Sequence, residues 1–225
     1  MENLTANQII ILIGAAAIIL PMARGALRQM VLLVTPTAIQ CEFEEGSEAL
    51  VGEAGSEGVC ELLERLRQLA FTPLGIKVEL QPLGSKFREL ALASREAKSF
   101  ASILVVKHLP RLYYYYYTPF EDGAIVLTAN GLFRSTELPD YIISAIPGTT
   151  PRELLLFHKA DIDKMIDAGH RPFSEFTQES RVDATGLFYR SIHSKRRMRL
   201  ASFLGLLILT VIAGVVGCAA WLIGW

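Results

Sequence analysis

The sequence predicts an α+β fold: a small antiparallel sheet with a meander at its centre, packed against helices and flanked by transmembrane α-helices. Both ends of the chain are long apolar runs, and the middle mixes alternating apolar and polar segments with two amphipathic helical patterns. At 225 residues, the chain has room for one domain besides the membrane segments. We expect membrane helices over 4–24 and 201–225, a cytoplasmic domain over 30–173, and a polar linker with a basic juxtamembrane segment over 174–200.

The C-terminal run, Phe203–Trp225, has no charged side chain and is long enough to cross about 30 Å of hydrocarbon as a helix. Trp221 and Trp225 lie at its far end, where indole rings favour the headgroup zone. By the positive-inside rule, the basic cluster before this run faces the cytoplasm and the final Trp faces outward. The cluster consists of Lys195, Arg196, Arg197 and Arg199.

The N-terminal run is apolar over Ile9–Leu20 and is followed by Arg24 and Arg28. A signal peptide begins with positive charge, whereas the early charge here is the negative Glu2. We therefore expect two spans in a plasma or inner cell membrane, with both termini outside and the central domain in the cytoplasm. Two alternatives stay open: a single C-terminal span, and a cleaved signal peptide followed by that span.

Small residues in both runs predict close helix packing. Ala213 and Gly217 are four residues apart, a spacing that lets two helix backbones approach. They favour a hairpin within the chain or self-association, although Gly and Ala are also ordinary residues of membrane helices.

The first half of the domain contains two predicted strands, Ile39–Phe43 and Ile76–Gln81, in which apolar and polar residues alternate. Between them, Ser56 can cap a helix that runs to about Ala70. Residues 86–98 fit a strand or a helix, and their Ala, Glu and Lys content favours the helix.

Three strands follow in quick succession, over 101–107, 112–118 and 124–129. Their connections are too short for a parallel crossover, so we expect an antiparallel meander with a turn at Asp122-Gly123. Thr150 and Glu153 then form a capping box for a helix that ends near Ala168.

Five consecutive tyrosines are the most unusual local feature. On a strand, three of them face one side of the sheet and two face the other, so we expect one set to lie on the outer face. That face either is simply wet or binds a partner. The predicted partner-binding residues are Tyr113, Tyr114, Tyr115, Tyr116 and Tyr117; an acidic block over Glu42–Glu64 is a second surface, usually a solvated one.

Catalytic and metal chemistry have little support in the sequence. Cys41, Cys60 and Cys218 form no zinc-type pattern, and no nucleotide-binding or hydrolase motif occurs, so we expect no cofactor, no metal and no catalytic residue. The net charge of −1 argues against a nucleic-acid partner. His158 and Asp161 share a helix face without a second such pair.

The predicted function is non-catalytic: a membrane-anchored protein that binds a protein partner or helps to organise a membrane assembly. The expected partners are the lipid bilayer, a protein, and a second copy through the small residues of the membrane helices. The alternative is a membrane-tethered enzyme or small-molecule sensor, with a pocket between the sheet and helix 151–168 and with His158 and Asp161 at its rim.

Overall fold

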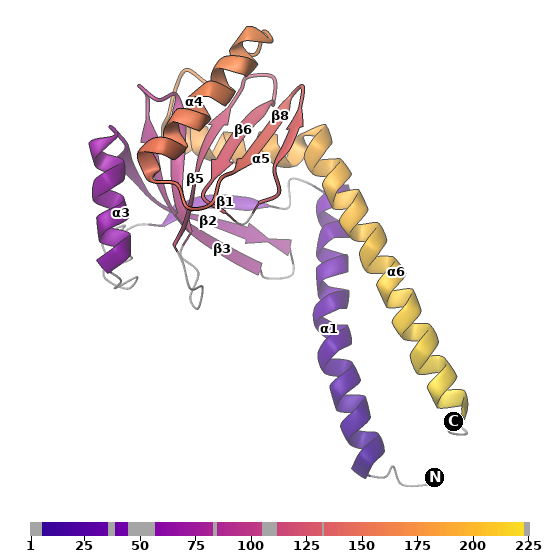
Figure 1. The fold of residues 1–225 in the computed structure, drawn as a ribbon. Coiled ribbons are helices and arrows are strands. Elements are labelled where there is room, and N and C mark those ends of the chain that lie inside the picture. The colour runs from indigo at the N-terminus through magenta and orange to yellow at the C-terminus, as the bar shows by residue number, and fades with distance from the viewer. Residues whose placement is uncertain are drawn as a thin grey trace. The chain divides into compact units, whose positions relative to one another are not determined.

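The chain is represented by a computed structural model that describes residues 6–35, 39–44, 57–82, 85–104, 112–131 and 133–222. It divides into two compact units. One contains the terminal helices α1 (Ala6–Val34) and α6 (Ile192–Leu222), and the other is an α+β domain built from residues 39–80 and 85–191 (Figure 1). The α+β fold class is therefore confirmed.

The domain is built on one eight-stranded sheet, which is larger than the small sheet expected. Neighbouring strands follow the order β1-β2-β3-β4-β5-β6-β8-β7. The strands are β1 (Gln40–Glu44), β2 (Thr72–Gln81), β3 (Ser85–Ser94), β4 (Ser99–Leu104), β5 (Tyr113–Pro119), β6 (Ile125–Ala129), β7 (Thr136–Leu138) and β8 (Tyr141–Ala145).

The predicted meander is present as β4, β5 and β6, which pair antiparallel. At the predicted turn, Gly123 has φ 87° and the Asp122 carboxylate accepts a hydrogen bond from the Ala124 amide at 3.1 Å. The meander is only part of the sheet, however. Sequential neighbours extend back to β1, and beyond β6 the next neighbour, β8, is parallel. Residues 130–140 separate β6 from β8 and contain β7, which pairs antiparallel with β8 and therefore runs opposite to β6, back towards the end of the sheet where β6 begins.

The helix favoured over residues 86–98 is wrong. This segment forms β3, which pairs antiparallel with β4 from Glu89 opposite Leu104 to Ser94 opposite Ser99. Leu90 and Leu92 face one side of the strand and are buried, and Glu89 faces the other side and is buried as well. Pairing with neighbours on both edges overrides the weak helical preference of Ala, Glu and Lys.

Helices cover both faces of the sheet. The α4 face is covered by α3 (Glu57–Gln68) and α4 (Pro151–Asp167), whose leucines pack with Leu92, Ile103 and Tyr116. The opposite α5 face is covered by α5 (Gln178–Arg190), from which Ala184 packs with Tyr117 and its neighbours. The capping box predicted at the start of α4 is confirmed, because both the Thr150 and the Glu153 side chains make their reciprocal bonds.

Residues 174–200 do not form a polar linker throughout. Their first part contains α5, which belongs to the domain, and Arg181 on it is buried. The segment looks like a linker in the sequence because one of its main buried groups, Arg181, is charged and pairs with Glu89, far away in the chain.

The two terminal helices pack against each other within their own unit. Figure 1 shows them side by side, with the start of α1 and the end of α6 at the same end of the pair. A Cβ atom added to Gly205 of α6 would lie 2.7 Å from the Ala26 Cβ of α1, so the backbones meet there. The predicted pair Ala213 and Gly217 is not at that contact: both residues are exposed, and a Cβ at Gly217 would meet nothing within 4 Å.

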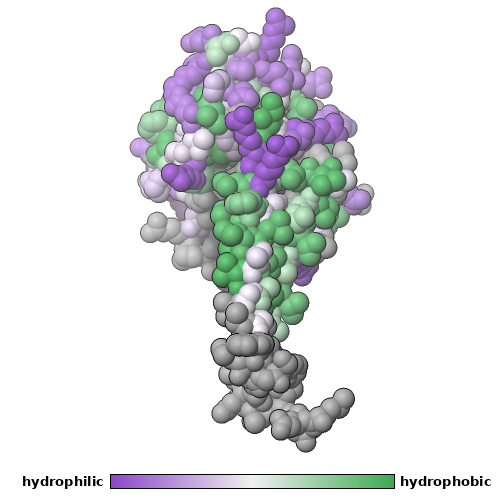
Figure 2. Space-filling view, turned by 90° about the vertical axis from the view of Figure 1, so that its right-hand side faces the viewer, coloured by the Kyte–Doolittle hydropathy of each residue, from purple (hydrophilic) through white to green (hydrophobic). Residues whose placement is uncertain are grey.

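Both terminal helices are long and apolar enough to cross a membrane, over Ile13–Val34 and Ser194–Gly214. Each helix extends past the bounds expected from sequence, because Arg28 lies inside α1, beyond residue 24, and the basic cluster lies inside α6, before residue 201. Figure 2 shows a mainly hydrophobic surface between the hydrophilic upper part and the grey lower part of the view. The side chain of Trp221 and all of Trp225 lie outside the described residues.

Candidate functional site

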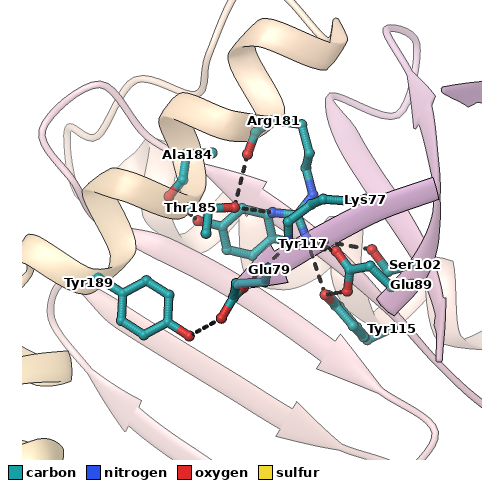
Figure 3. Close-up of polar contacts among 10 residues, drawn as sticks. All are labelled: Lys77, Glu79, Glu89, Ser102, Tyr115, Tyr117, Arg181, Ala184, Thr185 and Tyr189. Atoms are coloured by element: carbon teal, nitrogen blue, oxygen red, sulfur yellow. Dashed lines mark hydrogen bonds and ion pairs between the residues drawn. The ribbon is translucent and has the colours of Figure 1, made fainter. Parts of the chain in front are cut away.

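The most concentrated chemistry in the domain is a buried cluster of four charged side chains between the sheet and α5 (Figure 3). Lys77 and Glu79 come from β2, Glu89 comes from β3, and Arg181 comes from α5. Their exposed fractions are 2%, 6%, 0% and 3%. The two positive and two negative charges balance, which is the condition for holding ions in a low-dielectric interior.

Glu89 is the centre of this cluster. One of its carboxylate oxygens accepts hydrogen bonds from Lys77 Nζ and from Arg181 Nη2, each at 2.8 Å, and the other accepts from the Tyr115 hydroxyl. Burial alone would raise the pKa of Glu89, but the two cations and these donors outweigh it and lower the pKa to about 2. The carboxylate is therefore ionised and fully engaged at neutral pH.

Arg181 connects α5 to the sheet through this carboxylate. Its guanidinium lies 4.7 Å from the centre of the Tyr117 ring and 5.4 Å from that of Phe100, so its faces contact aromatic rings. Arg181 Nη2 also approaches the Tyr115 hydroxyl at 3.1 Å. Burial would lower the pKa of Arg181, but the charge of Glu89 raises it overall, so the side chain stays cationic.

The tyrosine run is an internal hub. Tyr114, Tyr115, Tyr116 and Tyr117 are buried and Tyr113 is half-buried, so the expectation that one face of the run points outward is wrong. The reason is position: β5 lies in the middle of the sheet and helices cover both of its faces. The assignment of all five residues to a partner surface stays a prediction, and Tyr113 is the member whose surface is most accessible.

The tyrosine hydroxyls hold the covering helices in place. On the α4 face, Tyr114 donates to the Thr149 carbonyl and Tyr116 donates to the Pro151 carbonyl, both at 2.9 Å. On the α5 face, Tyr117 donates to the Ala184 carbonyl at 3.1 Å. Burial raises the pKa of Tyr114 to about 12 and the pKa values of Tyr116 and Tyr117 further, so these groups remain protonated donors.

His158 lies on the inner side of α4, facing the sheet, and has no exposed surface. The Thr118 hydroxyl donates to the Lys98 carbonyl at 2.8 Å, so its oxygen must accept from His158 Nε2 at 3.0 Å. His158 Nδ1 is then unprotonated and accepts from the Thr128 hydroxyl at 2.9 Å. Burial lowers the pKa of this imidazole to about 3, so His158 is a neutral core residue at neutral pH.

A pocket of about 300 Å³ is present in the domain, although not where the alternative function places it. It lies between α3 and the start of α4 and is lined by residues that include Leu62, Leu112, Tyr114 and Arg65. His158 and Asp161 do not line it. Asp161 instead accepts a hydrogen bond from the Ser144 hydroxyl at 2.7 Å and pairs with Lys164.

The described residues contain no group of three or more His, Cys, Asp or Glu side chains that could hold a metal ion. Cys41 and Cys60 are free thiols, and burial raises the pKa of the Cys41 thiol. No protein-family model, curated protein or solved structure matches this chain. Functional inference therefore depends on the geometry alone.

The buried cluster is the feature that sequence reasoning missed. Lys77 and Glu79 occupy the polar positions of a correctly expected strand, and such positions usually face water. The residue that makes their burial possible, Arg181, lies 92 positions from Glu89. Of the acidic block, residues 45–56 lie outside the described part of the chain.

Proposed function

We propose that this chain is a membrane-anchored, non-catalytic protein whose α+β domain takes part in a protein assembly at the cytoplasmic face of a cell membrane. The observation that carries the proposal is the terminal helix pair. Ile18 on α1 and Phe203 on α6 are 63% and 65% exposed, and both helices are long and apolar enough to span. Burying this apolar surface in the hydrocarbon of a bilayer is favourable by about 25 cal/mol of free energy per Å².

The domain interior supports a non-catalytic role. A catalytic acid, base or nucleophile must reach a substrate and carry a pKa suited to proton transfer. Glu89 and Arg181 are instead buried, bonded to each other and held in their charged forms, and His158 is buried in its neutral form. Each of these groups serves the packing of a helix on the sheet.

The outer side of α4 is the surface that we assign to a protein partner. Leu156 and Phe157 are adjacent on this helix and are 63% and 50% exposed, whereas Leu154 and Leu155 on the inner side are buried. An exposed apolar patch with polar neighbours is typical of a protein contact. Lys159 and Asp163 supply the polar neighbours on the same exposed side.

Labelling with an impermeant thiol reagent in intact cells tests the anchoring and its orientation. New cysteines at Asn3 and after Trp225 should react from outside, and one at Ser135 should not. Reaction at Ser135 would overturn the orientation, and protection at Asn3 alone would reduce α1 to a helix that does not cross. Release of the chain by alkaline carbonate would refute membrane anchoring itself.

A photo-crosslinking amino acid at Phe157 tests the partner surface in intact membranes, with one at the exposed turn residue Glu96 as the matched control. We expect a discrete crosslinked protein from Phe157 alone, which disappears when the neighbouring Leu156 is changed to Ser. The same product from both positions, or its persistence in Leu156→Ser, would remove α4 as the contact.

The pocket supports a second candidate, a sensor of a small amphipathic molecule. Its walls combine apolar side chains with the guanidinium of Arg65. A thermal-shift screen of small amphipathic acids, repeated on Arg65→Trp to obstruct the opening, checks this. Stabilisation that survives the Trp substitution would place the compound elsewhere.

A further inference from the structure

We propose that the α1–α6 helix pair carries a collar that binds anionic phospholipid. The collar residues are Arg24 and Arg28 on α1 and Lys195, Arg196 and Arg199 on α6. This inference rests on the proposed membrane anchoring and adds the lipid class that the anchor selects. Three observations support it: the register of the two helices, the mixture of side chains at that level, and the position of the α6 charges in their helix.

The contact between Gly205 and Ala26 fixes the register of the pair. Because the helices run in opposite directions, residues before Ala26 on α1 lie beside residues after Gly205 on α6 (Figure 1). At a rise of about 1.5 Å per residue, Arg24 is level with about Leu207 and Arg28 with about Phe203. The basic residues of both helices therefore occupy one band about 18 Å deep along the pair.

The same band exposes large apolar side chains. Leu27 is 53% exposed, and Leu200 and Phe203 are 62% and 65% exposed. Hydrophilic and hydrophobic surfaces adjoin each other along α6 in Figure 2. A nucleic-acid surface would match the charges but not the apolar groups. Acyl chains and anionic headgroups of a bilayer interface match both.

The basic residues of α6 also lie near its N-terminus, the end of a helix that carries partial positive charge and therefore disfavours cations. The last residue before α6, Ser191, has φ −63° and ψ 153°, so a new helix begins at Ile192. Lys195, Arg196 and Arg199 follow within its first two turns, and the first turn contains no acidic residue. Within the described part of the chain, no ion pair engages these three side chains. A lipid phosphate complements the cations and the positive helix end together.

Lipid retention by the purified full-length chain tests the collar. The protein is exchanged in detergent with an equimolar mixture of phosphatidylcholine and phosphatidylglycerol, and the retained lipids are quantified by mass spectrometry. Each basic residue near an anionic surface changes affinity by about fivefold, so the wild type should retain about fivefold or more phosphatidylglycerol over phosphatidylcholine. Equal retention of the two lipids by the wild type would overturn the proposal.

Three triple variants, one of the collar and two controls, complete the test. Lys195→Gln/Arg196→Gln/Arg199→Gln should fall to nearly equal retention, whereas Arg95→Gln/Arg152→Gln/Lys159→Gln, which removes the same charge from exposed sites of the domain, should keep the enrichment. A charge-preserving variant, Lys195→Arg/Arg196→Lys/Arg199→Lys, should also keep it, because the three positive charges remain in place. Equal losses in the first two variants would refute the collar.

Carbonate extraction of the same variants separates the two proposals. If the collar variant remains in the membrane pellet but loses its lipid preference, the collar is supported and the anchoring stands. If the wild type remains in the pellet without a lipid preference, the collar is wrong and the anchoring stands. If the wild type is extracted, the proposed function fails, and the collar fails with it.

Discussion

Replacing Arg181 with Met should destabilise the domain through charge imbalance as well as lost contacts. The buried cluster changes from two cations and two anions to one cation and two anions, because Lys77, Glu79 and Glu89 remain. Removing one partner of a buried ion pair costs about 3–5 kcal/mol. Lys77 still bonds Glu89 in the variant, so we expect the low end, about 3 kcal/mol, which corresponds to a fall in Tm of roughly 6–12 °C.

The second substitution Glu89→Gln distinguishes this explanation from simple loss of packing. Arg181→Met/Glu89→Gln leaves Lys77 and Glu79, so the cluster is neutral again. The double variant should therefore be more stable than the sum of the single effects by at least about 1–2 kcal/mol. Chemical denaturation of the full chain in detergent, monitored by far-ultraviolet circular dichroism, measures the free energy of unfolding of the single and double variants. Arg95→Met is the exposed control.

Two results would refute this reasoning. A loss below about 1 kcal/mol in Arg181→Met would show that the buried charge is solvated or re-paired in the variant. Strict additivity of the two substitutions would show that Arg181 and Glu89 are not energetically coupled, whatever their separation in the structure.

Three further predictions follow from single contacts. His158 is neutral in the folded protein while its unfolded pKa is near 6.5, so stability should fall as pH drops from about 6.5, by about 2 kcal/mol at pH 5. Urea titrations at pH 7.5 and pH 5 should show that the extra loss is absent in His158→Gln; an unchanged pH slope would argue against a buried imidazole. Gly205→Leu should separate α1 from α6, because even a Cβ would lie 2.7 Å from the Ala26 Cβ; disulfide trapping between cysteines near this contact should drop several-fold, with Gly214→Leu as the control that leaves trapping intact. Tyr116→Phe should cost about 1 kcal/mol through the lost bond to the Pro151 carbonyl, and Tyr113→Phe should cost clearly less; equal costs would mean that the hydroxyl of Tyr116 holds nothing.

Local signals determined much of the architecture from the sequence alone. Alternation located β1 and β2, because a strand with unlike faces repeats every two residues, and the three successive strands predicted next correspond to β4, β5 and β6. The capping box of Thr150 and Glu153 located the start of α4, because the first amides of a helix need acceptors close in sequence. The two apolar runs indicated the terminal helices, because the length and composition of a segment are enough to identify a candidate membrane helix.

Helix and strand propensity misassigned β3, and periodicity could not say which faces are buried. Glu89 is fully buried, although a charged residue is rarely expected in a core. The tyrosine run was expected to be half-exposed because a two-residue repeat does not show whether helices from other parts of the chain cover both faces of the strand.

The sequence by itself determined the α+β class, the apolar terminal helices and the strands and helices with strong local patterns. Only the tertiary structure decided that β8 joins the sheet in parallel, that α5 belongs to the domain, and that Glu89 shares its carboxylate with Lys77 and Arg181. The physical reason is distance along the chain. A cap or an alternating strand is satisfied by neighbours in sequence, whereas the buried Glu89 carboxylate needs Lys77 from another strand and Arg181 from 92 residues away.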